Sequence, residues 1–217
     1  MKKIILSILT LLFLANCNNL QKKNVKNDSP QNFSVPEEAE KSQSATISYS
    51  KRNGCVFFDP DTSLCEIVLR DSESATRIIG TDNKIDDNEQ YHFYSKKERE
   101  TLTLSQYPGD FKNQISLFKV EFSDKASYNY KLLDIDTFRT EKGIKLGLTK
   151  NQIIERLGNC YLPVDSTKGY IELYYRIEQP EDSKTKLLEN NNMPVYYAKY
   201  KLWNNKLEKF EFGFEYP

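Results

Sequence analysis

The sequence predicts an α+β fold in which two tandem repeats, each a helix followed by an antiparallel β-meander, form one helix-backed sheet. Three observations support this prediction. A phrase made of an extended segment, a helix cap, a helix and a glycine occurs twice in the chain. Runs of alternating apolar and polar residues follow each copy. One helix over three strands makes a thin core, so two units that share a sheet edge bury more apolar surface.

The second copy of the phrase, GIKLGLTKNQIIERLG, spans residues 143–158. Thr149 stands at the position of a helix N-cap, where its hydroxyl can accept a backbone N–H. The apolar residues that recur at helical spacing are Ile153, Ile154 and Leu157. Gly158 follows as a C-terminal stop. We therefore expect a short helix between Thr149 and Gly158.

The first copy, IVLRDSESATRIIG, spans residues 67–80 and keeps each part of the phrase. Asp71 is the expected N-cap and Gly80 the expected stop. The apolar stripe between them consists of Ala75, Ile78 and Ile79. Aligning Gly80 with Gly158 pairs Asp71 with Thr149, with one residue gapped before the cap. The two copies therefore predict an internal repeat.

Three alternating runs follow each predicted helix and read as strands of an antiparallel meander. They are QYHFYS, ETLTLSQY and ISLFKVEF after the first helix, and GYIELYYRI, VYYAKYKLW and KLEKFEFGFEY after the second. Asn204 and Asn205 separate the last two runs, and because Asn tolerates positive φ they suit a tight hairpin turn. The expected domains are residues 46–124, a first repeat with an N-terminal hairpin, and residues 125–217, the second repeat.

The alternation assigns side chains to two faces of the sheet. Those expected to meet the helices are Tyr91, Phe93, Leu102, Leu104, Phe118 and Phe122 in the first repeat, and Ile171, Leu173, Tyr175, Ile177, Tyr196, Ala198, Tyr200, Phe210, Phe212 and Phe214 in the second. Those expected on the opposite face are Gln90, His92, Tyr94, Thr101 and Thr103, and Tyr170, Glu172, Tyr174, Arg176, Tyr197, Lys199, Lys201, Lys209 and Glu211.

The repeated phrase followed by a three-strand meander resembles the repeat of the beta-lactamase inhibitory protein superfamily. That group includes the small lipoprotein of the outer-membrane barrel assembly machine. Residues 143–216 carry the resemblance well and residues 65–122 carry it loosely. The resemblance implies two helix-plus-sheet units in tandem, whose joined sheet offers a concave, aromatic-rich surface to a protein partner.

The N-terminus, MKKIILSILTLLFLANC, has the layout of a secretory signal, and its apolar run is too short for a transmembrane helix. Its last four residues, Leu14 to Cys17, resemble the lipobox of bacterial lipoproteins, which implies a signal peptide at residues 1–16 and diacylation of Cys17. A plain cleaved signal and a core helix are the alternatives.

The polar residues after Cys17, up to Ala45, predict a flexible tether at residues 17–45. Asn18 lacks the Asp associated with inner-membrane retention, which favours the outer membrane by the same resemblance.

With Cys17 lipidated, three cysteines are left in an oxidising compartment. In CVFFDPDTSLC, Cys55 and Cys65 stand opposite each other across a hairpin centred on DPD. A cross-strand disulfide between them is therefore geometrically reasonable if they pair directly. Cys160 is then expected to be a buried apolar residue.

Composition and motifs argue against several function classes. The 31 basic and 31 acidic residues balance, whereas nucleic-acid binding needs concentrated positive charge. The only histidine, His92, lies mid-strand with no nucleophile elbow near it, which argues against Ser-His or Cys-His catalysis. The spacing of Cys and His predicts no zinc site, and no glycine-rich phosphate loop is present. We expect neither a cofactor nor a resident metal.

The leading hypothesis is a non-catalytic lipoprotein, an inhibitor or assembly accessory, that binds an envelope protein through a tyrosine-rich sheet face. Tyr and Arg dominate protein interfaces because they offer large rigid area with a polar end. The expected binding residues are His92, Tyr94, Tyr170, Tyr174, Arg176, Tyr197 and Lys199. An ordinary soluble face held by cross-strand pairs fits the same residues. The other function classes are a periplasmic enzyme using carboxylates such as Glu172 and Glu211, and a surface-exposed lipoprotein contacting the environment.

Overall fold

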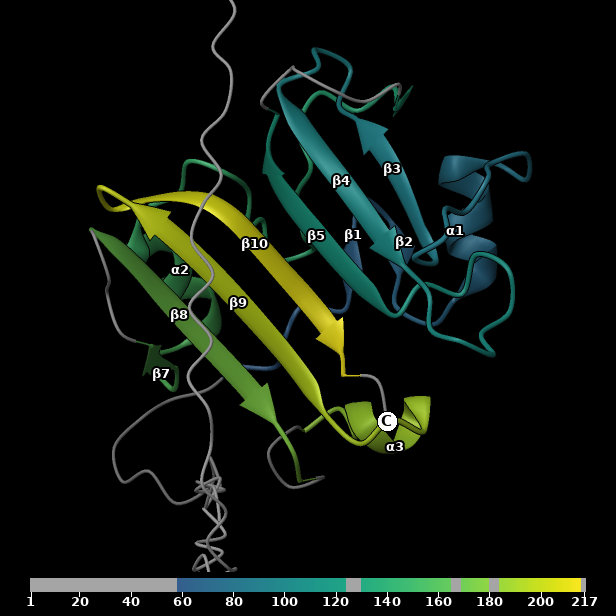
Figure 1. Ribbon diagram of the computed structural model, residues 1–217. Coiled ribbons are helices and arrows are strands. Elements are labelled where there is room, and N and C mark those ends of the chain that lie inside the picture. Colours follow the sequence, from purple (N-terminus) through teal and green to yellow (C-terminus); the bar gives the residue numbers. More distant parts are fainter. Residues whose placement is uncertain (1–57, 124–129, 165–168, 180–183, 216–217) are drawn as a thin grey trace, which may run out of the picture. The chain divides into compact units, whose positions relative to one another are not determined.

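The computed structural model describes residues 58–123, 130–164, 169–179 and 184–215, and the fold is α+β, as the sequence predicts (Figure 1). Three short helices occur in this part of the chain, namely α1 (Ser72–Ile79), α2 (Lys150–Leu157) and α3 (Leu187–Asn191). The strands are β1 (Ser63–Leu64), β2 (Ile67–Val68), β3 (Gln90–Tyr94), β4 (Glu100–Ser105), β5 (Leu117–Phe122), β6 (Lys131–Leu132), β7 (Leu162–Val164), β8 (Tyr170–Ile177), β9 (Tyr196–Trp203) and β10 (Lys206–Phe214). The predicted signal peptide, Cys17, the tether and Cys55 lie outside the described residues.

One mixed sheet contains all the strands except β1 and β2, in the order β6-β3-β4-β5-β10-β9-β8-β7. Every pairing is antiparallel except that of β3 with the two-residue strand β6. The strands after α1 and those after α2 thus form two antiparallel halves that meet where β5 pairs with β10. The two-residue turn at Asn204 and Asn205, with φ of 46° and 60°, confirms the predicted hairpin between β9 and β10.

Helices α1 and α2 form where the repeated phrase predicts them, and their ends have the same chemistry. Asp71 caps α1 by accepting the backbone N–H groups of residues 73 and 74, and Thr149 caps α2 in a capping box with Gln152. Gly80 and Gly158 end the two helices with φ of 86° and 84°, a conformation that glycine adopts without steric cost. Each helix has eight residues.

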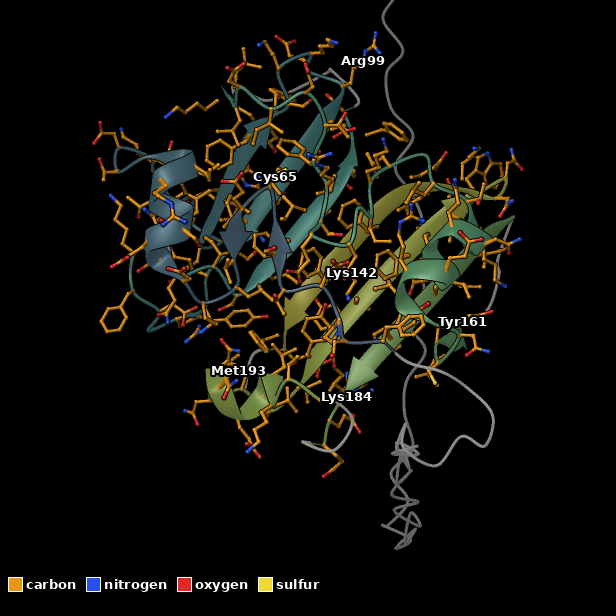
Figure 2. All side chains as sticks on the ribbon, turned by 180° about the vertical axis from the view of Figure 1, so that it is seen from behind. Cys65, Arg99, Lys142, Tyr161, Lys184 and Met193 are labelled. Atoms are coloured by element: carbon orange, nitrogen blue, oxygen red, sulfur yellow. The ribbon has the colours of Figure 1, made fainter. Side chains whose placement is uncertain are left out.

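Both helices and the β1–β2 hairpin lie on one face of the sheet, where they appear in front of the strands in Figure 2. The predicted inward residues are buried there, with Ile171 only half-buried. Phe122 is an exception, because its side chain is 51% exposed at the end of β5, so its predicted inward placement is wrong. The core is therefore built from one face of every central strand, which leaves the side chains of alternate residues on the other face.

Four elements differ from the sequence expectation or are missing from it, one of them the three-residue edge strand β7, which pairs with β8. The hairpin between β1 and β2 turns at Cys65 and Glu66, both with positive φ, rather than at the DPD sequence. Helix α3 is short and was not predicted, but Leu187 and Leu188 are buried and hold it against the core. Strand β6 is only two residues long, too short to give an alternating pattern.

The seam between the halves depends on a close approach of β10 to β5. Phe212 pairs with Phe118 and Gly213 with Leu117. Gly213 has a φ of 154°, and a Cβ at this position would lie 2.2 Å from the carbonyl oxygen of Ser116. The next residue, Phe214, donates its N–H to that same oxygen at 2.9 Å. The seam is therefore closed only if residue 213 has no side chain.

Asp61, a buried residue, holds the segment before β1 in place through hydrogen bonds. Asp61 is fully buried, and its backbone oxygen accepts a hydrogen bond from the Tyr196 hydroxyl at 2.8 Å. Its Oδ1 accepts the N–H of Lys142 at 3.0 Å, whereas Oδ2 has no hydrogen-bond partner among the described residues. Burial raises the pKa of Asp61 to about 6, although the bond from Lys142 opposes this shift.

We predict that Gly213→Ala destabilises the fold far more than Gly109→Ala. Gly109 also has positive φ, 93°, but no atom lies within 4 Å of its would-be Cβ. Gly109→Ala therefore costs only backbone strain, about 1 kcal/mol. Gly213→Ala adds the clash with Ser116 and costs at least about 3 kcal/mol. Urea unfolding of both variants measures the difference, and equal losses would contradict the close approach.

We predict that Asp61→Asn removes a pH-dependent loss of stability. The folded pKa of about 6 is above the ordinary value of 3.8, so the unfolded chain releases this proton first as the pH rises. The contribution of Asp61 to stability is thus fully present below about pH 3.8 and is lost as the pH rises through 6. The amide cannot ionise, so above pH 6 the variant is more stable than the wild type by up to about 3 kcal/mol.

Urea midpoints between pH 4 and pH 8 test this expectation. Asp136→Asn is the matched control, because the Asp136 side chain is 68% exposed and gains little from neutralisation. Midpoint curves of wild type and Asp61→Asn that stay parallel across this range would contradict the assignment.

Candidate binding face

The outer face of the sheet, opposite the helices, presents three rows of aligned side chains that cross the six strands β3, β4, β5, β10, β9 and β8. The first row is Gln90, Ser105, Leu117, Gly213, Tyr197 and Arg176. The second row is His92, Thr103, Lys119, Glu211, Lys199 and Tyr174. The third row is Tyr94, Thr101, Glu121, Lys209, Lys201 and Glu172. No described helix or strand lies over this face in Figure 1.

The register brings the predicted binding residues onto this one surface. Six of them occupy the three rows, namely His92, Tyr94, Tyr174, Arg176, Tyr197 and Lys199. The seventh, Tyr170, lies at the start of β8, where its ring packs against Trp203 with the ring centroids 4.7 Å apart. Because β5 pairs with β10, residues from β3 and from β8 belong to the same continuous face.

Tyrosine rings and lysine ammonium groups interleave on the half of this face formed by β8 and β9. Lys199 Nζ lies 4.7 Å from the ring centroid of Tyr197 and 5.6 Å from that of Tyr174. Lys201 Nζ lies 4.3 Å from the ring centroid of Tyr170. Cation–π contacts of this kind contribute about 0.5–1 kcal/mol each at exposed sites. These side chains therefore hold one another in place on the surface of the sheet.

Two of the predicted binding residues, Arg176 and Tyr197, are largely occupied by contacts within the fold or buried in it. The Arg176 guanidinium contacts the carboxylates of Glu178 and Glu215 and the hydroxyl of Tyr174. Burial disfavours its charged form, but the bonds to Glu215 and Glu178 outweigh this and raise the pKa of Arg176. Tyr197 lies on the outer face, as expected, but it is only 9% exposed, so little of its side chain is accessible. Burial and the nearby Glu211 carboxylate raise the pKa of Tyr197.

The half of the face formed by β3, β4 and β5 is hollowed. Strand β4 contributes only the short side chains of Thr101, Thr103 and Ser105 to it. Longer side chains of β3 and β5 and the ring of Tyr130 surround them. The result is a cavity of about 540 Å³, which the alternation pattern alone does not reveal. Small side chains in the middle strand are the sequence signal that could have indicated it.

His92 is held in this hollow by three contacts. Its Nε2 lies 2.9 Å from Oδ2 of Asp86, and its Nδ1 lies 3.2 Å from the Thr103 hydroxyl. The ring of Tyr130 stacks on the imidazole, with centroids 4.7 Å apart and planes 12° apart. Burial opposes ionisation of Asp86, but hydrogen bonds from His92 and from backbone N–H groups outweigh it and lower the pKa of this carboxyl. An ionised carboxylate only accepts, so Nε2 carries the proton and Nδ1 faces Thr103.

Sequence reasoning missed Asp86 and Tyr130, because both are brought to His92 by the fold. Asp86 precedes β3, and Tyr130 precedes the edge strand β6. A carboxylate, an imidazole and a hydroxyl joined by hydrogen bonds are also found in acyl-transfer enzymes, where this arrangement activates a nucleophile. In this chain it fixes the orientation of the imidazole and of the Thr103 hydroxyl.

Charged side chains on the outer face are paired with one another, both within a strand and between neighbouring strands. Lys119 Nζ lies 2.6 Å from Glu121, and Lys199 Nζ lies 3.3 Å from Glu211. Glu172, which the enzyme hypothesis named together with Glu211, stands opposite Lys201 in the register. The two carboxylates thus lie on different strands, each facing a lysine. Each such exposed pair contributes about 0–1 kcal/mol, and together they leave the face close to neutral.

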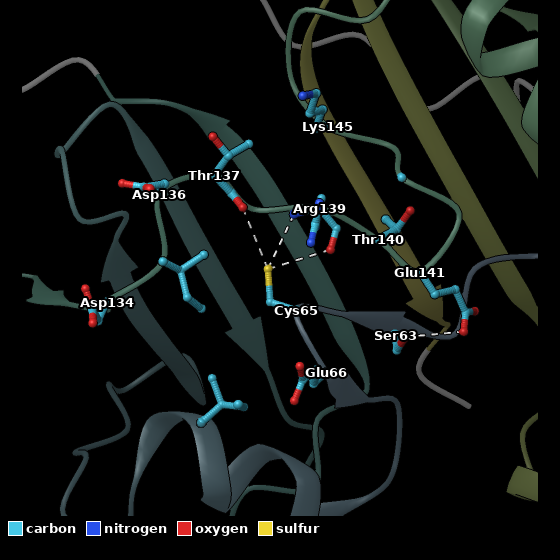
Figure 3. Close-up of a pocket in the computed structure, with 13 residues that line it drawn as sticks. Ser63, Cys65, Glu66, Asp134, Asp136, Thr137, Arg139, Thr140, Glu141 and Lys145 are labelled. Atoms are coloured by element: carbon cyan, nitrogen blue, oxygen red, sulfur yellow. Dashed lines mark hydrogen bonds between the residues drawn. The ribbon is translucent and has the colours of Figure 1, made fainter.

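A larger cavity, about 780 Å³, lies on the helix side of the sheet around Cys65 (Figure 3). The Cys65 thiol is free, so the predicted Cys55–Cys65 disulfide is wrong. The sulfur lies 3.6 Å from the carbonyl oxygen of Arg139 and accepts the N–H of the same residue at 3.4 Å (Figure 3). Burial raises the pKa of this thiol, which favours the unreactive protonated form.

The described part of the chain holds no cluster of three or more His, Cys, Asp or Glu side chains suited to a metal ion. No helix in this part is both long enough and apolar enough to cross a membrane.

Comparisons with family models, with curated proteins and with solved structures return no match to this chain.

We predict that Cys160 pairs with Cys55. Cys160 is buried, as expected, but it is disulfide-bonded and so is not a lone apolar side chain. Phe58 N–H donates to the carbonyl oxygen of Leu157 at 3.2 Å. Cys55 is three residues before Phe58 and Cys160 three residues after Leu157, so the two cysteines can come within bridging distance. Peptide mapping of the non-reduced protein is expected to find this linked pair, and a Cys17–Cys160 peptide would contradict it.

Proposed function

We propose that the protein is a lipid-anchored, non-catalytic binding protein of the cell envelope that contacts a protein partner through the outer face of its sheet. The observation that carries the proposal is the continuity of this face. Three rows of side chains cross both halves of the sheet, while the helices lie on the opposite side. A pre-ordered surface of Tyr, Trp, Lys and Arg has the composition of a protein interface.

The repeat hypothesis supports the same proposal. Both α1 and α2 have eight residues, an N-cap side chain and a C-terminal glycine with positive φ. Three long antiparallel strands follow each helix, β3 to β5 after α1 and β8 to β10 after α2, where the short β7 and α3 are additional elements. The last strands of the two sets, β5 and β10, pair with each other. We propose that this arrangement arose from a tandem repeat of the kind found in the beta-lactamase inhibitory protein superfamily. In that superfamily the joined sheet is the surface offered to a partner.

The lipobox-like sequence supports the proposed location. A diacylated Cys17 anchors the chain stably, because each buried methylene contributes about 0.8 kcal/mol. The polar segment after it then separates the folded part from the bilayer. Asn18 stands where an Asp would favour the inner membrane, so the proposed location is the outer membrane. A binding module at the end of a tether can reach a partner without leaving the membrane.

The contact is expected to centre on the half formed by β8 and β9, where Tyr170, Tyr174, Lys201 and Trp203 are accessible. Arg176 and Tyr197 support these residues from within the sheet. Because the rings and ammonium groups are already ordered, little side-chain entropy is lost on binding.

We predict that a Tyr170→Ala, Tyr174→Ala, Lys201→Ala triple variant loses its partner. The full chain, cross-linked in intact envelopes and captured after detergent solubilisation, is compared with this variant. The control is Arg77→Ala with Glu155→Ala, which removes two exposed charges from α1 and α2 on the other side of the sheet. The face variant is expected to bind the captured partner at least about tenfold more weakly, and the control as well as wild type. Equal capture by all three folded proteins would contradict the proposal.

A further inference from the structure

We propose that the hollow between β3, β4 and β5 binds a neutral saccharide, a ligand separate from the protein partner. The cavity of about 540 Å³ is in the range of small-ligand sites. Its walls come from three strands and from Tyr130, and its floor consists of short hydroxyl side chains. Three properties of this lining point to a sugar.

One wall of the hollow is aromatic. The rings of Tyr94 and Tyr130 lie with their centroids 5.1 Å apart, and Tyr130 also stacks on His92. All three residues line the cavity and are half-buried. The C–H groups on one side of a pyranose ring pack against such aromatic surfaces, because the ring faces carry partial negative charge. The wall therefore suits a ligand with a flat, weakly apolar side.

The floor and the opposite wall are polar and can both donate and accept hydrogen bonds. Each hydroxyl of Thr101, Thr103 and Ser105 has donor and acceptor capacity. Glu121 and Glu211 supply acceptors, and Lys119 supplies a donor. Adjacent hydroxyls of a sugar need this mixture, because every hydroxyl both donates and accepts.

The charges that line the hollow are balanced, which selects against an ionic ligand. Lys119 is paired with Glu121 at 2.6 Å, and Glu211 is paired with Lys199 at 3.3 Å. An anion would lie beside two carboxylates, and a cation would have to displace a lysine. A neutral ligand can add hydrogen bonds to these groups without separating the pairs.

The side chain of His92 holds the lining of the hollow in a fixed arrangement before a ligand binds. Asp86 fixes its ring at one nitrogen, and the other nitrogen orients the Thr103 hydroxyl. Tyr130 covers the face of the imidazole. The polar floor and the aromatic wall are therefore joined through one side chain, which lowers the cost of ordering the site when a ligand binds.

The test is saturation-transfer NMR on the full chain in detergent micelles with three neutral disaccharides, N,N′-diacetylchitobiose, cellobiose and maltose, each at millimolar concentration. We expect transfer to at least one of them. Tyr94→Ala and Thr103→Val, which remove the aromatic wall and one hydroxyl, are each expected to weaken binding at least about tenfold. Phe111→Ala removes an aromatic ring that is 79% exposed and does not line the hollow; it is the control and is expected to bind like wild type.

Absence of transfer to all three disaccharides would overturn the proposal. So would equal transfer to wild type and to both pocket variants, because the sugar would then bind elsewhere. Glucose 6-phosphate provides a charge control, and its binding in preference to the neutral sugars would overturn the assignment of a neutral ligand. Thr103→Val keeps the volume and the β-branched shape of the side chain, so it is expected to keep the fold.

Discussion

Pairing between β5 and β10 makes one surface out of two small sheets. Each half alone would have a three-strand meander under one short helix, with an open edge at its last strand. Joining these last strands removes both edges and places the two apolar faces side by side over a common core. The same pairing sets the register of the outer face, so that His92 of the first half and Tyr174 of the second stand in one row. Gly213 permits this contact because nothing larger fits against Ser116.

The two halves of the outer face differ because their middle strands carry different side chains. In β9 the outward positions hold Tyr197, Lys199 and Lys201, which fill the surface and pack on the tyrosines of β8. In β4 they hold two threonines and a serine, which leave a polar hollow. The two halves of one sheet therefore present outer surfaces of different shape and polarity.

Much of the fold follows from local patterns in the sequence. The caps Asp71 and Thr149, the glycine stops and the strict alternation of the long strands are short-range signals, and the structure confirms the elements that they predict. The remaining features depend on contacts between distant residues. The Tyr197 ring packs against the ring of Tyr174 on the neighbouring strand β8, and Asp86 reaches His92 only after the loop before β3 has folded. The cysteine pairing was misread for the same reason, since Cys65 forms the turn of a hairpin whose register the sequence pattern does not determine.

Native-state hydrogen exchange at the backbone amides of β5 and β10 tests most directly whether the two halves form a single cooperative sheet. If they do, the protected amides at the seam exchange only through global unfolding, with the same free energy and the same urea dependence as the innermost amides of β4 and β9. Exchange at the seam through a smaller, sub-global opening, while β4 and β9 stay protected, would contradict the account. It would mean that the halves fold separately and that the outer face is not one continuous surface.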